Sequence, residues 1–161
     1  GYANQPVAVL HPTDVVNNNT LTTLLNDTLK RSGLNAESAT SDWGTVLQRR
    51  SRQEPPGQGG WDALIVLFGG VDLGNPGVHP LLRGNGRQAW FGWPTLEGLR
   101  EEWLGAADVD AQKPIARRIQ AALWQDLPHI PLGQYYIDAA YRRGLTGIQK
   151  GMTLPINIRR G

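Results

Sequence analysis

The chain lacks cysteine altogether, which removes several kinds of chemistry at once. Without thiols it has no disulfide framework, no thiolate metal site and no cysteine nucleophile. It also has no apolar run that approaches the ~18 residues of a membrane helix. Its first residues lack the basic and apolar regions of a signal peptide, so we expect any export signal to lie outside this chain.

Histidine and serine are sparse and scattered, which argues against metal binding and catalysis. His11, His79 and His129 stand far apart, and the chain has no helical His-x-x-x-His pair. None of its four serines lies in a Gly-x-Ser-x-Gly turn, which would expose a nucleophile. We therefore expect no catalytic residues, no metal and no cofactor, and we predict that the chain is not an enzyme.

The basic residues are also dispersed. The formal net charge is only +2, and the arginines form separate doublets rather than a stripe with interleaved aromatics. Nucleic-acid binding requires positive charge concentrated on one face. We expect no nucleic-acid partner.

What is present favours an ordinary globular α/β domain. The chain has 161 residues, 40% of them hydrophobic, which is enough for a buried core. Residues 7–10 predict a strand, leucines at helical spacing predict a helix that stops at Gly33, and residues 34–40 predict a second strand. This strand–helix–strand order favours parallel pairing of the two strands. We predict an α/β fold with a mixed, mostly parallel sheet flanked by helices, as a single domain over residues 1–161.

The remaining elements follow from caps and periodicity. Asp42 is placed to cap a short helix through residue 50, Thr95 to cap a second, and Asp108 or Asp110 to begin a third. Residues 130–136 and 154–158 read as further strands. The residues expected to be buried are Leu21, Leu24, Leu25, Leu29, Ile65, Leu67, Ile119 and Leu123.

The most informative stretch runs from Gly60 to Pro76. Residues 63–67 are five consecutive apolar residues, typical of a strand buried on both faces, and Gly69-Gly70 allows a sharp turn where that strand ends. Asp72 follows. In open α/β sheets ligands collect beyond the carboxyl ends of the strands, so this carboxylate could receive a cationic group. Alternatively, Asp72 caps its own backbone in a turn.

An irregular, aromatic-rich stretch follows over residues 69–94. Loops this long in compact domains are usually functional or disordered, and the aromatics argue against disorder. Elsewhere, Trp43 either lines a ligand cleft or packs beneath it. The predicted ligand-binding residues are Asp72, Trp43, Phe68, Asn75, Trp90, Phe91 and Trp93.

The order of motifs resembles a known family over nearly the whole chain. The segments that show the resemblance are Pro6-Val7-Ala8-Val9-Leu10, Ser32-Gly33-Leu34, Asp42-Trp43-Gly44-Thr45 before Arg49-Arg50, Gly60-Trp61-Asp62, Asp72-Leu73-Gly74-Asn75-Pro76 and Ile130-Pro131-Leu132-Gly133-Gln134. Together they are similar to the C-terminal lobe of the solute-binding proteins of peptide, dipeptide and nickel ABC transporters, solute-binding family 5.

The resemblance implies one lobe of a two-lobed periplasmic receptor. Such a receptor captures a peptide or other small amino-bearing solute between its lobes and delivers it to a membrane permease. In relatives an acid in a loop like this one pairs with the amino terminus of the ligand, a role that maps onto Asp72. The implied partners are the ligand, the missing N-terminal lobe of the same protein and the ABC permease.

Two other functional classes remain open from the residues alone. One is a stand-alone α/β hydrolase or transferase with its site in the 69–94 loop, which would need a nucleophile–base pair that the sequence does not show. The other is an interaction module that docks the exposed aromatics of that loop onto a protein partner.

Overall fold

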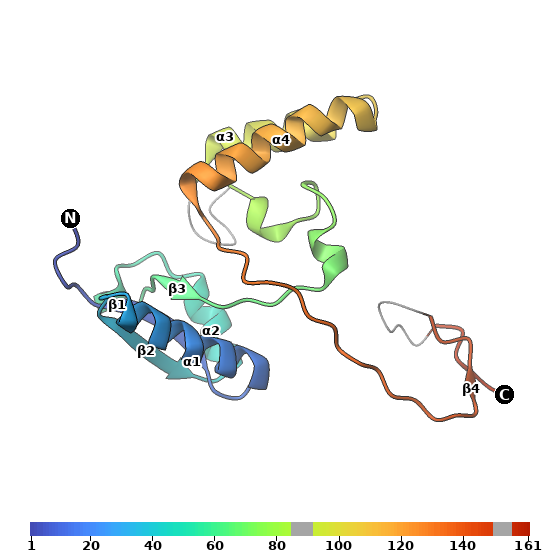
Figure 1. Ribbon diagram of the computed structural model, residues 1–161, viewed down its shortest axis with the longest axis horizontal. Helices are drawn as coiled ribbons and strands as arrows, with labels where there is room; N and C mark the ends of the chain where they lie inside the picture. The colour runs from blue at the N-terminus through green and yellow to red at the C-terminus, as the bar shows by residue number, and fades with distance from the viewer. Residues whose placement is uncertain (85–91, 150–155) are drawn as a thin grey trace. The chain divides into compact units, whose positions relative to one another are not determined.

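The computed structural model describes residues 1–84, 92–149 and 156–161, which form two compact units, Gly1–His129 and Ile130–Gly161. In chain order the elements are β1 (Val7–Pro12), α1 (Val16–Arg31), β2 (Ala36–Ser41), α2 (Trp43–Arg50), η1 (Pro56–Gln58), β3 (Ala63–Leu64), η2 (Gly70–Leu73), η3 (Pro80–Leu82), α3 (Pro94–Leu104), α4 (Val109–Asp126), β4 (Leu145–Thr146) and β5 (Arg159–Arg160), where η marks a short 3-10 helix (Figure 1).

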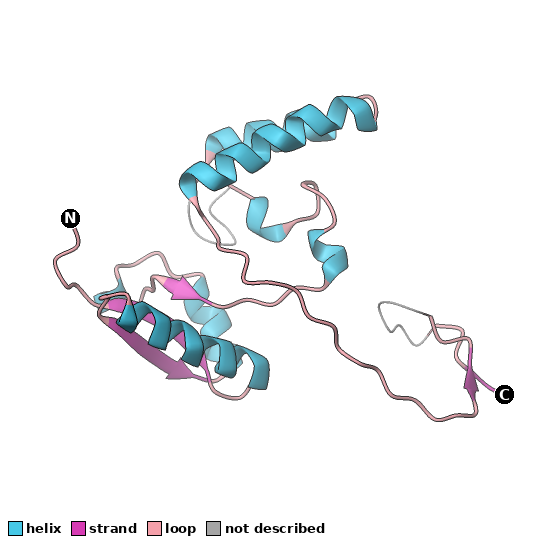
Figure 2. Ribbon diagram, viewed as in Figure 1, coloured by secondary structure: helices cyan, strands magenta, loops and turns pink. Residues whose placement is uncertain are grey.

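A three-stranded parallel sheet packs with α1 and α2 in the N-terminal part of the first unit (Figure 2). The strand order is β2-β1-β3, with Val9 opposite Ser38 on one side and Ala63 on the other. Val9 and Leu10 are fully buried because β1 has a strand on each edge. The predicted α/β class and the predominantly parallel pairing are confirmed.

Helix α1 covers one face of this sheet with polar residues. Asn18, Thr22 and Asn26 recur every four residues and are buried, whereas Leu24 is 58% exposed. The expected burial of Leu24 is therefore wrong. The reason is that the amides have partners on the sheet: Asn18 Nδ2 donates to the carbonyl of Ile65 at 3.1 Å. The other leucines on the helix, Leu21, Leu25 and Leu29, are half-buried beside this polar stripe.

Strand β3 is shorter than the sequence predicts. It pairs with β1 only at Ala63 and Leu64; Ile65 beyond it is buried, as expected, but Leu67 is 37% exposed, so its expected burial is wrong. In this register residue 66 would lie opposite Pro12, which has no N–H to donate to a neighbouring strand. The chain therefore leaves the sheet early.

Helices α3 and α4 pack against each other around an apolar cluster. Its buried members are Leu82, Leu96, Leu99, Ile115 and Ile119, with Leu123 partly buried against them. Asp108 caps α4 by accepting from the N–H of Ala111 at 2.9 Å, as predicted. Helix α3 instead begins at Pro94, so the prediction that Thr95 caps it is wrong; proline at the first helical position already has the required φ.

The second unit has little regular structure. Strands β4 and β5 pair antiparallel, with Leu145 opposite Arg160. The predicted strand over residues 130–136 is wrong for this structure, since the whole stretch is exposed and in no sheet. Residues 154–155 of the last predicted strand lie outside the described residues, and pairing is seen instead at residues 159–160. Among the described helices, none has the length and hydropathy needed to cross a membrane.

Candidate functional site

Asp72 lies on the short helix η2 and is exposed. Its backbone N–H donates to the carbonyl of Gly69 at 2.9 Å, which closes the turn. The residue is exposed, and within the described part of the chain its carboxylate has neither a hydrogen bond nor an ion pair. One carboxylate oxygen lies 3.2 Å from where a Cβ on Gly69 would stand. The absence of a side chain at Gly69 therefore leaves the space beside this acid open.

Asn75, not Asp72, supplies the turn chemistry of this loop. Its Oδ1 accepts from the N–H of Gly77 at 2.9 Å and from the N–H of Val78 at 3.3 Å. Such a side chain-to-backbone turn is what Asx residues commonly form. The alternative in which Asp72 caps its own backbone is thus not what the structure shows.

Exposed apolar residues lie close to Asp72 in the sequence. Val71 is 60% exposed, Leu73 40% and Val78 50%, all within a few residues of Asp72. A single negative charge among exposed aliphatic groups suits a ligand that carries an ammonium beside apolar surface.

A buried arginine that the sequence analysis missed anchors the same loop. Arg100 on α3 is 6% exposed; its Nε donates to the carbonyl of Pro76 at 3.0 Å and its Nη2 to the carbonyl of Gly77 at 3.3 Å. Its Nη1 donates to Glu97 Oε2 at 2.8 Å, which balances the charge. Arg100 thereby fixes the loop that follows Asp72 onto the helix. The available sequence signal was a charged residue next to Leu99 on the apolar face of a helix.

Two histidines also join this loop to the end of α4. The rings of His79 and His129 lie with their centroids 5.8 Å apart, and each buries an Nδ1 atom that has no partner. Burial lowers the pKa of both side chains, and the neighbouring His129 lowers that of His79 further. The folded state therefore favours the neutral form of both rings.

The predicted aromatic contacts are dispersed. Phe68 is half-buried just before the Asp72 turn, whereas Trp93 packs partly buried against the apolar cluster of α3 and α4. Trp90 and Phe91 lie outside the described residues. Trp43 is half-buried at the start of α2. Asp72 and Asn75 are thus brought together in one loop with Phe68 leading into it, while Trp43 and Trp93 stand at the starts of α2 and α3.

The carboxyl ends of β1 and β2 form a second polar edge. Asp14 Oδ1 accepts from the N–H of Trp43 at 2.8 Å, and Asp42 caps α2 by accepting from the N–H of Thr45 at 3.0 Å. The hydroxyl of Thr45 also donates to Asp42, and this bond, with the backbone N–H, lowers the pKa of Asp42. These acids hold the strand ends and the helix start together, and each has committed an oxygen to the backbone.

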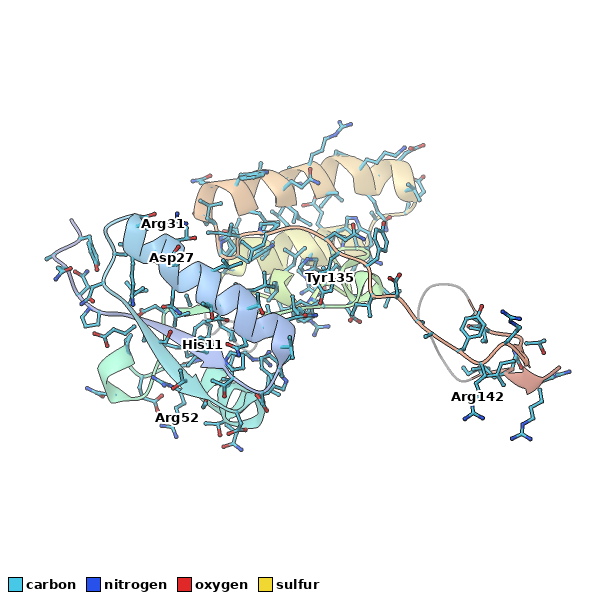
Figure 3. All side chains as sticks on the ribbon, turned by 60° about the horizontal axis from the view of Figure 1, so that its bottom comes forward. His11, Asp27, Arg31, Arg52, Tyr135 and Arg142 are labelled. Atoms are coloured by element: carbon cyan, nitrogen blue, oxygen red, sulfur yellow. The ribbon has the colours of Figure 1, made fainter. Side chains whose placement is uncertain are left out.

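A chain of hydrogen bonds runs from α1 to the sheet through His11, the one residue of this network that Figure 3 labels. Asn26 Nδ2 donates to Ser38 Oγ at 2.8 Å, Ser38 Oγ lies 3.1 Å from His11 Nδ1, and His11 Nε2 lies 2.8 Å from Asn19 Oδ1. Asn19 Nδ2 donates to the carbonyl of Thr13, so its Oδ1 must accept from Nε2–H, and His11 Nδ1 then accepts from the serine hydroxyl.

This arrangement resembles a nucleophile, a base and an orienting amide, and sequence reasoning missed it because the residues are far apart in the chain. Ser38, however, lies within a strand and not on the sharp strand-to-helix turn that exposes a nucleophile. Its oxygen already accepts from Asn26. The network therefore serves to attach the polar face of α1 to the sheet.

One opening in the described residues lies at the amino ends of the strands and not beside Asp72. It is a shallow groove of about 570 Å³ whose lining includes Glu37, Arg49 and Asp62. Arg49 donates to the carbonyls of Gly59 and Gly60, and Asp62 accepts from the N–H of Ala8, all at 2.8 Å. Two of its three charged groups thus serve the fold. Within the described ranges no three acidic or histidine side chains cluster as metal ligands would.

Comparison with known proteins gives one informative relative. No protein-family model matches the chain. The chain is 35% identical over 159 residues, 97% of its length, to the Sinorhizobium fredii protein named "Probable peptide ABC transporter periplasmic-binding protein y4tO". The match covers 30% of that protein, so the chain spans less than a third of the length of this relative. The resemblance expected from the motifs is confirmed, and the name of the relative describes a binding protein, not an enzyme.

Proposed function

We propose that residues 1–161 form the C-terminal lobe of the solute-binding component of an ABC importer. The complete protein would close two lobes around a peptide or other small amino-bearing solute and deliver it to a membrane permease. It would act in the periplasm, without a cofactor and without chemical conversion of its ligand. The similarity to a peptide-binding relative along 97% of this chain supports the assignment, and the 30% share of that relative leaves room for another lobe.

The observation that carries the proposal is the carboxylate of Asp72, which has no partner among the residues that the structure describes. A carboxylate that has no protein partner keeps its full hydrogen-bonding capacity for a ligand, and a charge-assisted bond to an ammonium is among the strongest available. The turn made by Asn75 and the anchor at Arg100 fix the position of the loop without engaging the acid. In the closed receptor the second lobe would exclude water from this pair, which strengthens it.

The test is a calorimetric titration of the complete protein with a panel of amino-bearing solutes, peptides included. Asp72→Asn should retain the fold, because asparagine has the same shape and also suits a turn. It should weaken binding by about 2–5 kcal/mol, the usual loss when one member of a buried charge pair is removed.

Two matched variants make the result specific. Asp27→Asn removes the same charge from the exposed surface of α1, where Asp27 pairs with Arg31, and should leave affinity unchanged. Glu37→Gln removes an acid that lines the groove at the amino ends of the strands and should also leave affinity unchanged. Equal affinities for Asp72→Asn and the wild type would exclude Asp72 from the site. A loss confined to Glu37→Gln would place the ligand in the groove.

A further inference from the structure

The Asp72 loop, residues 72–79, ends at one member of the histidine pair. The N–H of His79 donates to the carbonyl of Asn75 at 3.1 Å, which closes the last turn of the loop. The ring of His129, just after α4, lies against the ring of His79, with the centroids 5.8 Å apart and the planes tilted by 38°. The two rings therefore connect the loop that carries Asp72 to the end of a helix.

The contact between the rings suits two neutral imidazoles. Each ring buries its Nδ1 atom, and among the described residues neither atom has a hydrogen-bond partner. A neutral imidazole carries its proton on one nitrogen, so the buried Nδ1 can be the bare one, whereas an imidazolium carries a proton on both. A charged ring would thus bury an N–H without an acceptor, and two charged rings would also repel each other. Protonation therefore acts against the contact.

The charged side chains of the adjoining segments do not compensate a charged ring. On α3, Glu97 pairs with Arg100, the residue that holds the loop, at 2.8 Å. Those on the remaining segments are exposed: Asp72 on the loop, Arg83 after η3 and Asp126 at the end of α4. None of these described groups is a cause of the lowered pKa of either ring, which comes from burial and, for His79, also from the charge of His129.

We propose that the two rings form a latch on the Asp72 loop: the latch is closed while both rings are neutral, and protonation of either ring opens it and lowers the affinity of the receptor for its solute. This inference rests on the proposed function, in which Asp72 binds the amino group of the solute, and adds the regulation of that site by pH. Opening frees the far end of the loop, so the carboxylate of Asp72 is no longer held in position. His79 and His129 are therefore positioning residues and not solute ligands.

The direction of the pH dependence follows from linkage. Protons bind better to the open latch and the solute binds better to the closed one, so each weakens the binding of the other. Because the closed latch lowers the pKa of both rings below the ordinary 6.5, it should open as the pH falls from that value. Carboxylates ordinarily titrate at about pH 4 and amino groups above about pH 7, so a pair between them keeps its charges over this window.

Hydrogen exchange of the complete protein at about pH 7 and about pH 5 tests the latch. The reporters are the amides of residues 77–79, which donate to Asn75, and the amides of residues 115–119 in α4 report global opening. Rates are divided by those of an unstructured peptide at the same pH. At the lower pH the protection of residues 77–79 should fall at least about fivefold, while that of residues 115–119 changes by less than about twofold. Constant protection of the loop, or an equal loss in both segments, would overturn the inference.

The double variant His79→Gln, His129→Gln is the matched control, because glutamine does not titrate. Its loop should show the same protection at both pH values, whatever the absolute level. A fall equal to that of the wild type would overturn the inference, since another group would then be responsible. If the double variant does not fold, the comparison of the two segments in the wild type decides.

Native mass spectrometry connects the latch to the solute. The complete protein is measured with its co-purified small molecule, or with trialanine as an amino-bearing probe where none co-purifies. At constant protein concentration the ratio of free to bound wild type should rise at least about fivefold between the two pH values, and that of the double variant should stay constant. An unchanged ratio in the wild type would overturn the inference and retain the proposed function. No adduct with either molecule at the higher pH would refute the proposed function, and this inference with it.

Discussion

Residues 7–64 and residues 130–161 reach very different degrees of order, and the difference lies in where their partners are. In the first region every strand is parallel to a neighbour within the chain, and the hydrogen-bond chain through His11 links α1 to the sheet. In the second, two short strands of two residues each pair with one another, and the apolar stretch before them is exposed. The difference shows that a sequence pattern reports a local structural preference, whereas a strand forms only where neighbouring strands can pair with it.

The largest effect is expected outside both regions, where α3 buries the charge of Arg100. Arg100→Leu removes three hydrogen bonds and leaves Glu97 and two backbone carbonyls without their donor. Breaking a buried pair in this way should cost about 3–5 kcal/mol of unfolding free energy. Arg118→Leu breaks a pair with Glu102 whose side chains are 57% and 47% exposed, and should cost less than about 1 kcal/mol. Urea denaturation of both variants measures the difference; equal losses would contradict the anchoring role of Arg100.

The sheet itself gives the next largest effect. Leu10 is fully buried in the central strand, so Leu10→Ala should lower the unfolding free energy by about 2–5 kcal/mol through lost burial and the cavity it leaves. Leu24→Ala makes the same chemical change on a side chain that is 58% exposed. It should cost under about 1 kcal/mol, since little apolar area returns to water. A large loss for Leu24→Ala in this chain would show that the polar face of α1 has been wrongly assigned as its buried face.

A helix cap should give a smaller loss. Asp108→Ala removes the side chain that accepts from the N–H of Ala111 at the start of α4. The expected cost is about 0.5–2 kcal/mol, and Asp108→Asn should recover most of it because asparagine caps about as well. Thermal unfolding followed by circular dichroism compares the two. No difference between alanine and asparagine at this position would mean that the cap does not contribute.

The histidine pair predicts a modest dependence of stability on pH. The folded state lowers the pKa of His79 and His129 below the ordinary value of 6.5, so the unfolded chain takes up protons first as the pH falls. Stability should therefore decrease as the pH drops from about 6.5 towards the lowered values. The double variant His79→Gln, His129→Gln should show a smaller decrease in its urea midpoint over that window than the wild type. An unchanged slope would mean that the two rings are as solvated in the folded state as in the unfolded state.

The smallest effect is expected in the second region. Tyr136 is 87% exposed, so Tyr136→Ala should change the stability of this chain by no more than about 0.5 kcal/mol. In the complete protein the same variant should cost about 3–5 kcal/mol if the stretch is an interior strand, since it would then empty an aromatic site in a core. The difference between the loss of stability in this chain and the loss in the complete protein measures how far the second region depends on partners. A small effect in both would leave the stretch as exposed surface.

Local signals predicted the fold where the chain supplies its own partners. The parallel strand–helix–strand opening, the glycine stop at Gly33 with φ +85° and the cap at Asp108 all follow from short-range chemistry and are confirmed. The burial of α1 was not predictable in this way. Its leucines and its asparagines each form a helical stripe, and only the hydrogen-bond partners on the sheet decide which stripe faces inward.

For the site, the sequence identified the loop but not what holds it. The glycines and Asp72 predicted a binding loop, and ligand binding by Asp72 stays a prediction. The turn made by the Asn75 side chain was not predicted, since the sequence analysis considered turn chemistry for Asp72 and took Asn75 as a ligand-binding residue. The anchor at Arg100 depends on carbonyls more than twenty residues away in the chain, and such long-range contacts leave no periodic signal.

The central claim is that this chain belongs to a receptor for an amino-bearing solute, and native mass spectrometry of the complete, gently purified protein tests it most directly. The proposal predicts one small molecule per protein, released on denaturation, whose fragmentation shows a primary or secondary amine. The same adduct should be reduced or absent in Asp72→Asn and retained in Asp27→Asn. A retained adduct in Asp72→Asn, or a bound molecule without an amino group, would contradict it.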